Sequence, residues 1–111
     1  MHGYSQAIFE VLARLSPEEL IDIIRKGKAP ATRLTYAAEI LGRDVGTRAA
    51  TNALLDILES HRSPLVREGA VLGLAYHLDR FGVRHGLQRI VEQDPSPGVR
   101  RAAQEALDEQ D

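Results

Sequence analysis

A threefold internal repeat constrains this 111-residue chain more than any other feature of its sequence. Three short signatures, PATR, PLVR and PGVR, each begin a run rich in alanine and leucine, and they start at Pro30, Pro64 and Pro97. The signatures are 34 (64 − 30) and 33 (97 − 64) residues apart. Spacing of this size is typical of proteins that stack one supersecondary unit on the next. The sequence therefore predicts a repeat array.

Apolar residues recur at helical spacing in the segments between the chain breaks. Ser16, Pro17 and Glu19 have the pattern of a capping box that begins a helix, and Gly27 suits the left-handed turn that follows one. Gly42 is expected to end the next helix. No segment alternates between polar and apolar residues over a useful length, so we expect no β-sheet. The predicted helices span residues 4–15, 16–27, 30–42, 48–60, 64–78, 83–93 and 97–109.

The helices that precede the signatures repeat as well. Leu20, Leu54 and Leu87 each lie 13 residues before the arginine of the following signature, and we expect these leucines in the core. The chain then divides into units of helix A, short turn and helix B at about 16–42, 46–78 and 82–110, with an extra helix over residues 4–15. This pattern predicts an all-α protein, a right-handed α-solenoid of three helix pairs with an N-terminal capping helix, forming a single domain over residues 1–111.

One face of the last helix indicates where the array ends. Its residues at i, i+3, i+4 and i+7 are all polar: Arg101, Gln104, Glu105 and Asp108. The equivalent positions are Glu68, Val71, Leu72 and Ala75 in the second unit and Leu34, Ala37, Ala38 and Leu41 in the first. A following unit would cover the apolar version of this face, so we expect the third unit to be a C-terminal cap. The chain could be a complete short solenoid or a piece of a longer one.

The composition narrows the class of function. The chain has no cysteine, which excludes disulfides and thiolate metal sites and favours a reducing cytosol. The N-terminus lacks a basic region followed by an apolar one, and no apolar run approaches the ~20 residues of a membrane helix, so we expect a soluble protein that is not exported. A formal net charge of −2 disfavours nucleic-acid binding, which normally needs a strong basic excess.

At its signatures the chain resembles the HEAT repeats, and in particular the short bacterial HEAT-like repeats found in phycobilisome lyases. In those repeats helix B begins with Pro-x-Val-Arg after a turn that contains Asp, as in residues 94–100 (DPSPGVR). The resemblance covers about residues 16–110. It implies the solenoid fold and leaves the function open, because the family includes scaffolds, import receptors, enzyme subunits and DNA-repair proteins.

The signature arginines Arg33, Arg67 and Arg100 are expected to hold the stack together. Each lies in the first turn of a helix, where the helix dipole disfavours a cation by about 0.3–1 kcal/mol. We expect each guanidinium to offset this cost with a carbonyl or carboxylate of the neighbouring unit, with an anion site along one groove as the alternative. An aspartate six positions before the arginine occurs only once, as Asp94, so three identical ion pairs are not expected.

The loops between units carry the most suggestive surface feature. Residues 43–48 (RDVGTR) and 80–84 (RFGVR) should lie on the same edge of a solenoid, and their arginines define what we call the loop edge: Arg43, Arg48, Arg80 and Arg84. This edge is a candidate docking site for an acidic protein surface or a phosphate backbone. The alternative is that Arg43 and Arg80 only complement helix C-termini.

No pattern indicates catalysis, a metal or a cofactor. The four histidines have no metal-ligand spacing, and His77 and His85 are expected to be solvated. A close pair of carboxylates on an otherwise apolar helix face, a Gly-rich phosphate loop and a Gly-x-Ser-x-Gly motif are all absent. Gly69 and Gly73 lie inside a predicted helix at a cost of about 1 kcal/mol each relative to alanine. The close approach of a neighbouring helix is the simplest reason for both.

We therefore expect a non-enzymatic, cytoplasmic protein-protein interaction module or adaptor that needs no cofactor. Its partner would be another protein, bound on a concave surface lined by helices B with Glu68, Arg101 and Glu105, or at the loop edge. Two alternatives stay open. One is a nucleic-acid-binding protein, as the resemblance to HEAT-like DNA glycosylases allows, and the other is a non-catalytic subunit of an enzyme such as a chromophore lyase.

Overall fold

The structure is a computed structural model that describes residues 2–109, with side chains from residue 6 onward. It contains α1 (His2–Ala13), α2 (Pro17–Lys26), α3 (Ala31–Asp44), α4 (Arg48–Ser60), α5 (Pro64–Leu74), the short 3-10 turn η1 (Ala75–His77), α6 (Val83–Gln93) and α7 (Pro97–Asp108). No strand occurs in residues 2–109. The predicted all-α class is confirmed, and each helix begins and ends within a few residues of its predicted position.

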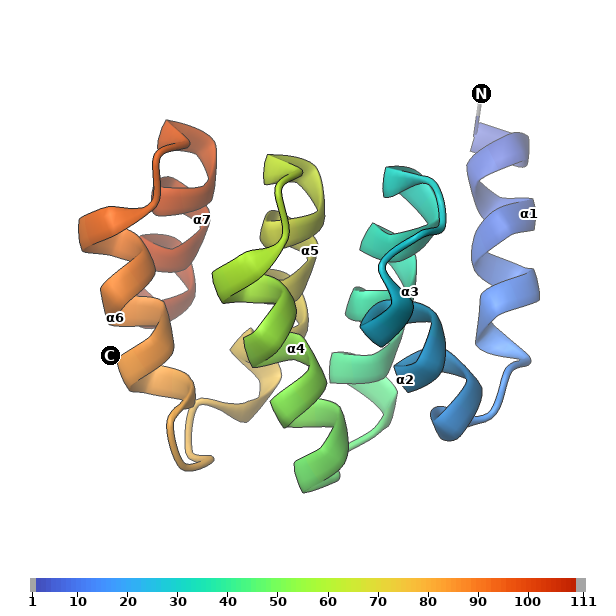
Figure 1. The fold of residues 1–111 in the computed structure, drawn as a ribbon, viewed down its shortest axis with the longest axis horizontal. Helices are drawn as coiled ribbons and strands as arrows, with labels where there is room; N and C mark the ends of the chain where they lie inside the picture. The colour runs from blue at the N-terminus through green and yellow to red at the C-terminus, as the bar shows by residue number, and fades with distance from the viewer. Residues whose placement is uncertain (1, 110–111) are drawn as a thin grey trace.

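The helices stack in pairs along the chain (Figure 1). One layer consists of α2, α4 and α6, and the other of α1, α3, α5 and α7. Within the pairs α2 packs on α3, α4 on α5 and α6 on α7, while α1 packs on α3 at the end where the chain begins. None of these helices is long and apolar enough to cross a membrane. This arrangement is the helical solenoid that the repeat predicts.

Hydroxyl side chains begin four of the helices. Ser16 Oγ accepts a hydrogen bond from the Glu19 N–H at 3.1 Å and Glu19 Oε1 accepts one from the Ser16 N–H at 3.0 Å, so the predicted capping box is present. Thr47, Ser63 and Ser96 each accept from the N–H three residues later, at 3.2, 3.4 and 3.5 Å. Each bond satisfies a backbone donor that the first turn of a helix leaves free.

The three aligned leucines lie in the core. Leu20, Leu54 and Leu87 are each at most 2% exposed, and one apolar cluster contains buried residues from all seven helices. The same side of helix A is therefore buried in each unit, as the predicted register requires.

The face that is polar in α7 becomes more exposed along the array. Its four residues in α3 are all buried, and in α5 Val71 is buried while Leu72 is 45% exposed. In α7 all four are exposed: Arg101, Gln104, Glu105 and Asp108. In α7, polar residues thus occupy the positions where this face meets solvent.

Helices α3 and α5 touch through their backbones. A Cβ atom on Gly42 would lie 2.2 Å from Gly73 Cα, one on Gly73 would lie 2.5 Å from the Ala38 carbonyl oxygen, and one on Gly69 would lie 3.0 Å from the α3 backbone. The predicted close approach at Gly69 and Gly73 is confirmed. The prediction that Gly42 ends its helix is wrong, because α3 continues to Asp44 and Gly42 belongs to the same contact.

The helix predicted over residues 64–78 is also shorter than expected. Its regular part ends at Leu74, and η1 continues the chain in a tighter turn. This turn brings His77 over the end of α3, where His77 Nε2 donates to the Gly42 carbonyl at 2.6 Å. His77 is half-buried, so the expectation that it is simply solvated is wrong.

We predict that Gly73→Ala lowers the free energy of unfolding by about 1–3 kcal/mol, although alanine is the better helix former, because the new methyl group would overlap the α3 backbone. Chemical denaturation monitored by circular dichroism measures the change. Gly98→Ala is the matched control, since the nearest atom to its Cβ would be 3.8 Å away. Equal stability of the two variants would contradict the close contact.

Candidate interaction surfaces

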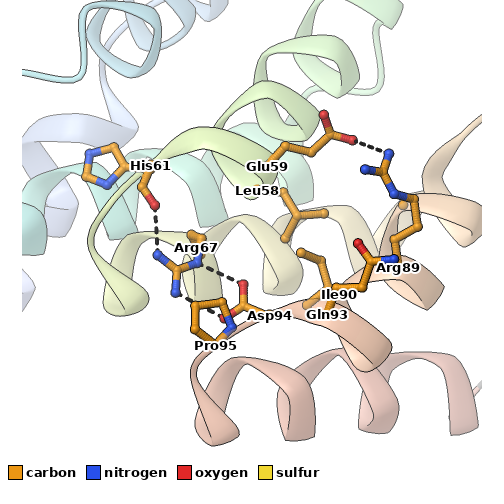
Figure 2. Close-up of a pocket in the computed structure, with 10 residues that line it drawn as sticks. Leu58, Glu59, His61, Arg67, Arg89, Ile90, Gln93, Asp94 and Pro95 are labelled. Carbon is orange, nitrogen blue, oxygen red and sulfur yellow. Dashed lines mark hydrogen bonds and ion pairs between the residues drawn. The ribbon is translucent and has the colours of Figure 1, made fainter.

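A buried ion pair joins the second and third units. Arg67 on α5 is 7% exposed, and its Nε and Nη2 donate to Asp94 Oδ2 and Oδ1 at 2.9 and 3.0 Å (Figure 2). Its Nη1 donates to the His61 carbonyl at 2.8 Å. A bidentate arginine-carboxylate pair has fixed geometry, so this contact orients α5 relative to the turn between α6 and α7.

Asp94 also organises its own turn. Its Oδ1 accepts a hydrogen bond from the Ser96 N–H at 2.9 Å, and its carbonyl oxygen accepts one from Arg100 Nη1 at 2.6 Å. The carboxylate is buried and all of these groups lie within the turn or the adjacent helix ends. One aspartate therefore links the end of α6, the start of α7 and the helix of the preceding unit.

The expectation that every signature arginine reaches the neighbouring unit holds for Arg67 alone. Arg100 bonds instead to the Asp94 carbonyl of its own unit. Arg33 is exposed and makes no hydrogen bond or ion pair within the described residues. The reason lies at position 61, where the second unit has histidine in the place of Asp94 and so offers Arg33 no carboxylate.

His61 reproduces part of the Asp94 turn. Its Nδ1 accepts a hydrogen bond from the Ser63 N–H at 3.0 Å, as Asp94 Oδ1 does from the Ser96 N–H. Burial, helped by the nearby Arg62 charge, lowers the pKa of His61 below its usual value of 6.5. The neutral ring is the form that can accept at Nδ1, so the turn favours an uncharged His61.

A shallow hollow opens beside the ion pair (Figure 2). Glu59 Oε1 and Arg89 Nη1 form an exposed ion pair at its rim, 3.2 Å apart, while Leu58 and Ile90 form part of its wall. Within the described residues, no buried side-chain nitrogen or oxygen lacks a hydrogen-bond partner. The hollow therefore presents no unpaired buried group to a ligand.

The loop edge divides into separate parts in the structure. Arg43 forms an ion pair with Asp44, with its Nε 2.8 Å from Asp44 Oδ1, and its Cζ lies 5.1 Å from the centre of the Phe9 ring. The hydrogen bond with Asp44 raises the pKa of Arg43 and lowers that of Asp44. Phe9 also meets Tyr36 edge to face, with ring centres 6.0 Å apart. Arg43 thus helps to hold α1 on α3.

Arg48 and Arg80 line one hollow together with Phe81, whereas Arg84 lines a different hollow between α6 and α7. Arg80 Nη2 donates to the Gly46 carbonyl across the two loops. Phe81 is fully exposed. The structure therefore brings two of the four arginines of the loop edge together, around an aromatic side chain that the sequence did not single out.

A row of exposed apolar side chains lies in the helix-B layer. We call this row, together with its polar neighbours Glu68, Arg101 and Glu105, the B face. Leu65, Leu72 and Tyr76 are 49%, 45% and 56% exposed. Glu68 lies between them on α5 and is half-buried, and Arg101 and Glu105 are exposed on α7. The spacing of 7 and 4 residues could have indicated one helix face from the sequence, although it could not show that the face is uncovered.

The side chains of the described residues contain no group of three or more histidine, aspartate or glutamate residues placed to hold a metal ion. The surface features that these residues form are an aromatic-arginine hollow and a mixed apolar and charged helix face.

We predict that Asp94→Asn lowers the free energy of unfolding by about 3–5 kcal/mol, because it leaves the buried Arg67 charge without a partner of opposite charge. Asparagine retains an oxygen for the Ser96 N–H, so the turn itself can persist. Glu59→Gln removes one carboxylate of an exposed pair and should cost about 1 kcal/mol or less. Urea denaturation compares the two variants, and a similar loss in both would show that the buried pair has no special role.

We also predict a pH effect at His61. Because the pKa of His61 is lowered in the folded protein, His61 of the unfolded chain binds more protons than His61 of the folded protein between pH 6.5 and the lowered pKa. The stabilising effect of the neutral ring is complete above pH 6.5 and is lost as the pH falls through the lowered pKa. Melting temperatures at neutral and mildly acidic pH should therefore fall more for the wild type than for His61→Asn, and equal slopes would contradict this account.

Comparison with known proteins identifies the family to which this stack of helix pairs belongs. No curated protein and no solved structure matches the chain. The family model described as HEAT repeats matches residues 16–108, which include all three helix pairs from α2 to α7. Because this match covers most of the sequence, the chain belongs to the HEAT-repeat family.

Proposed function

We propose that this protein is a non-enzymatic binding module that holds a partner protein on its B face. HEAT repeats commonly serve as scaffolds for protein interactions. The observation that carries the proposal is the row formed by Leu65 and Leu72 on α5 and Tyr76 in η1, each about half exposed. Apolar side chains that gather on one exposed face mark sites of interaction more often than scattered ones do.

The polar residues beside this row give the face the composition of an interface. Glu68 and Arg101 occupy equivalent positions of successive units, as do Leu72 and Glu105, so each pair points in a similar direction from neighbouring helices. An apolar centre with charged residues at its rim is the usual anatomy of a protein interface, and tyrosine and arginine are frequent at its strongest contacts. The charges of both signs suit an amphipathic segment of a partner, with its apolar side on α5.

The remaining parts of the proposal follow from the sequence. We place the protein in the cytoplasm, because a chain without cysteine suits a reducing compartment. The DPSPGVR turn supports repeats of the short bacterial type found in phycobilisome lyases. In this proposal residues 1–111 form one domain, with α1 covering the first unit.

The experiment is capture of the partner from a native lysate through a photo-crosslinking amino acid at position 65, which belongs to the same exposed row and is left unchanged in the variant below. We predict that the double variant Leu72→Ser and Tyr76→Ser lowers capture of this partner at least about tenfold, because both side chains would lose apolar contact area. The helical circular dichroism signal should be unchanged, since neither side chain is buried.

Val11→Ser is the matched control, because Val11 is a comparably exposed apolar residue (61%) on a different helix, α1. Capture that survives the double variant, or that Val11→Ser weakens equally, would remove the B face from the proposal. Loss of the partner after nuclease treatment would instead favour the nucleic-acid alternative.

A further inference from the structure

Phe81 occupies a position that folding does not explain. Its side chain is fully exposed, whereas Phe9 and Tyr36 are half-buried against each other. A phenylalanine side chain gains stabilisation by leaving water, and at this position it gains none within the chain. A fully exposed aromatic ring at the tip of a loop suits contact with another molecule.

The segment that carries Phe81 is held in place by the end of α3 and the loop that follows it. Arg80 Nη2 donates to the Gly46 carbonyl, and His77 Nε2 donates to the Gly42 carbonyl at 2.6 Å. Gly82 follows with a positive φ of 84°, which turns the chain into α6. Two hydrogen bonds before the ring and a defined turn after it fix the direction of the loop, so little ordering is needed when a partner binds.

The hollow beside Phe81 is electropositive. Its lining consists of Arg48, Thr51, Asn52, Arg80 and Phe81, and so contains two guanidinium groups and no carboxylate. In the described part of the chain, neither Arg48 nor Arg80 takes part in an ion pair. The nearby Asp44 instead pairs with Arg43. These two guanidinium groups retain donors that can bind carboxylates in a bidentate manner.

We infer that this hollow binds an acidic peptide segment that carries an apolar side chain. The carboxylates of the segment would bind Arg48 and Arg80, and its apolar side chain would pack on the ring of Phe81. Asn52, which is exposed, supplies further hydrogen bonds to the peptide, whereas Thr51 is buried and its hydroxyl already donates to the Thr47 carbonyl. The site lies on other residues than the B face and does not depend on the function proposed for that face.

A single-stranded nucleic acid is the competing ligand, because a base could stack on Phe81. Such strands are usually bound by a line of cations that follows the backbone and by several aromatic rings. The hollow offers two guanidinium groups and one ring, and the chain as a whole carries a formal net charge of −2. Charge and geometry therefore favour the acidic peptide.

The test is selection from a random peptide library on the immobilised full-length protein, followed by fluorescence anisotropy with the selected peptides. We expect sequences in which aspartate or glutamate flanks a large apolar residue. Phe81→Ala and Arg48→Glu should each weaken their binding at least about tenfold. Both side chains are exposed and neither makes a hydrogen bond in the described structure, so these variants should fold normally, which circular dichroism checks.

Two controls separate this site from other surfaces. Arg84→Glu makes the same charge change in a different hollow, and the Leu72→Ser and Tyr76→Ser variant alters only the B face; neither should change peptide affinity more than about twofold. Selected peptides without acidic residues, affinity unchanged in Phe81→Ala and Arg48→Glu, or failure to select any peptide would overturn the inference. Peptides lost only with the B-face variant would reject this site and support the proposed function. Displacement of the peptide by oligothymidylate at physiological salt would assign the hollow to nucleic acid.

Discussion

The contact between the backbones of α3 and α5 determines the form of the surfaces that this protein presents. Gly42 and Gly73 have no side chains to separate the two helices, so the helices meet closely near their C-terminal ends. The segments that follow both helices are therefore neighbours, and His77 and Arg80 can reach the carbonyls of Gly42 and Gly46. The direction in which Phe81 points depends on this approach.

The next contact in the same layer is made differently. Between α5 and the third unit the fixed element is the Arg67–Asp94 pair, which is buried and bidentate. Leu72, whose counterpart Ala38 is fully buried under α5, is left 45% exposed at this junction. The repeat in sequence thus produces two unlike junctions, and the apolar row of the B face arises from the second one.

Much of the fold follows from the sequence because its signals are local or strictly periodic. The capping box at Ser16, the proline signatures and the alignment of Leu20, Leu54 and Leu87 determine the helices, their register and their buried sides. The prediction for Gly42 is wrong because a glycine after an apolar run gives the same sequence pattern in two cases, when it ends a helix and when it allows a second helix to pack closely. The contacts of Arg33 and Arg100 depend on which group of the neighbouring turn lies beside each guanidinium. A single sequence does not specify that arrangement.

The candidate surfaces were less predictable for the same reason. The sequence grouped four loop arginines by their position on one edge, but the structure pairs Arg43 with Asp44 and places Arg84 in another hollow. The exposure of Phe81 and Tyr76 is a property of how the units pack, since apolar residues in a repeat are normally expected to be covered.

The hydrogen bond from His77 to the Gly42 carbonyl has a consequence for how such an array folds and evolves. Gly42 lies in the last turn of α3, where carbonyl groups have no partner within their own helix. The second unit supplies that partner, so the end of the first unit is completed only when the second is folded. A helix pair cut out at its loops would lose the hydrogen bond from His77 to the Gly42 carbonyl. An insertion or deletion of a repeat would keep this bond only if it included both the end of the helix and the segment of the next unit that caps it.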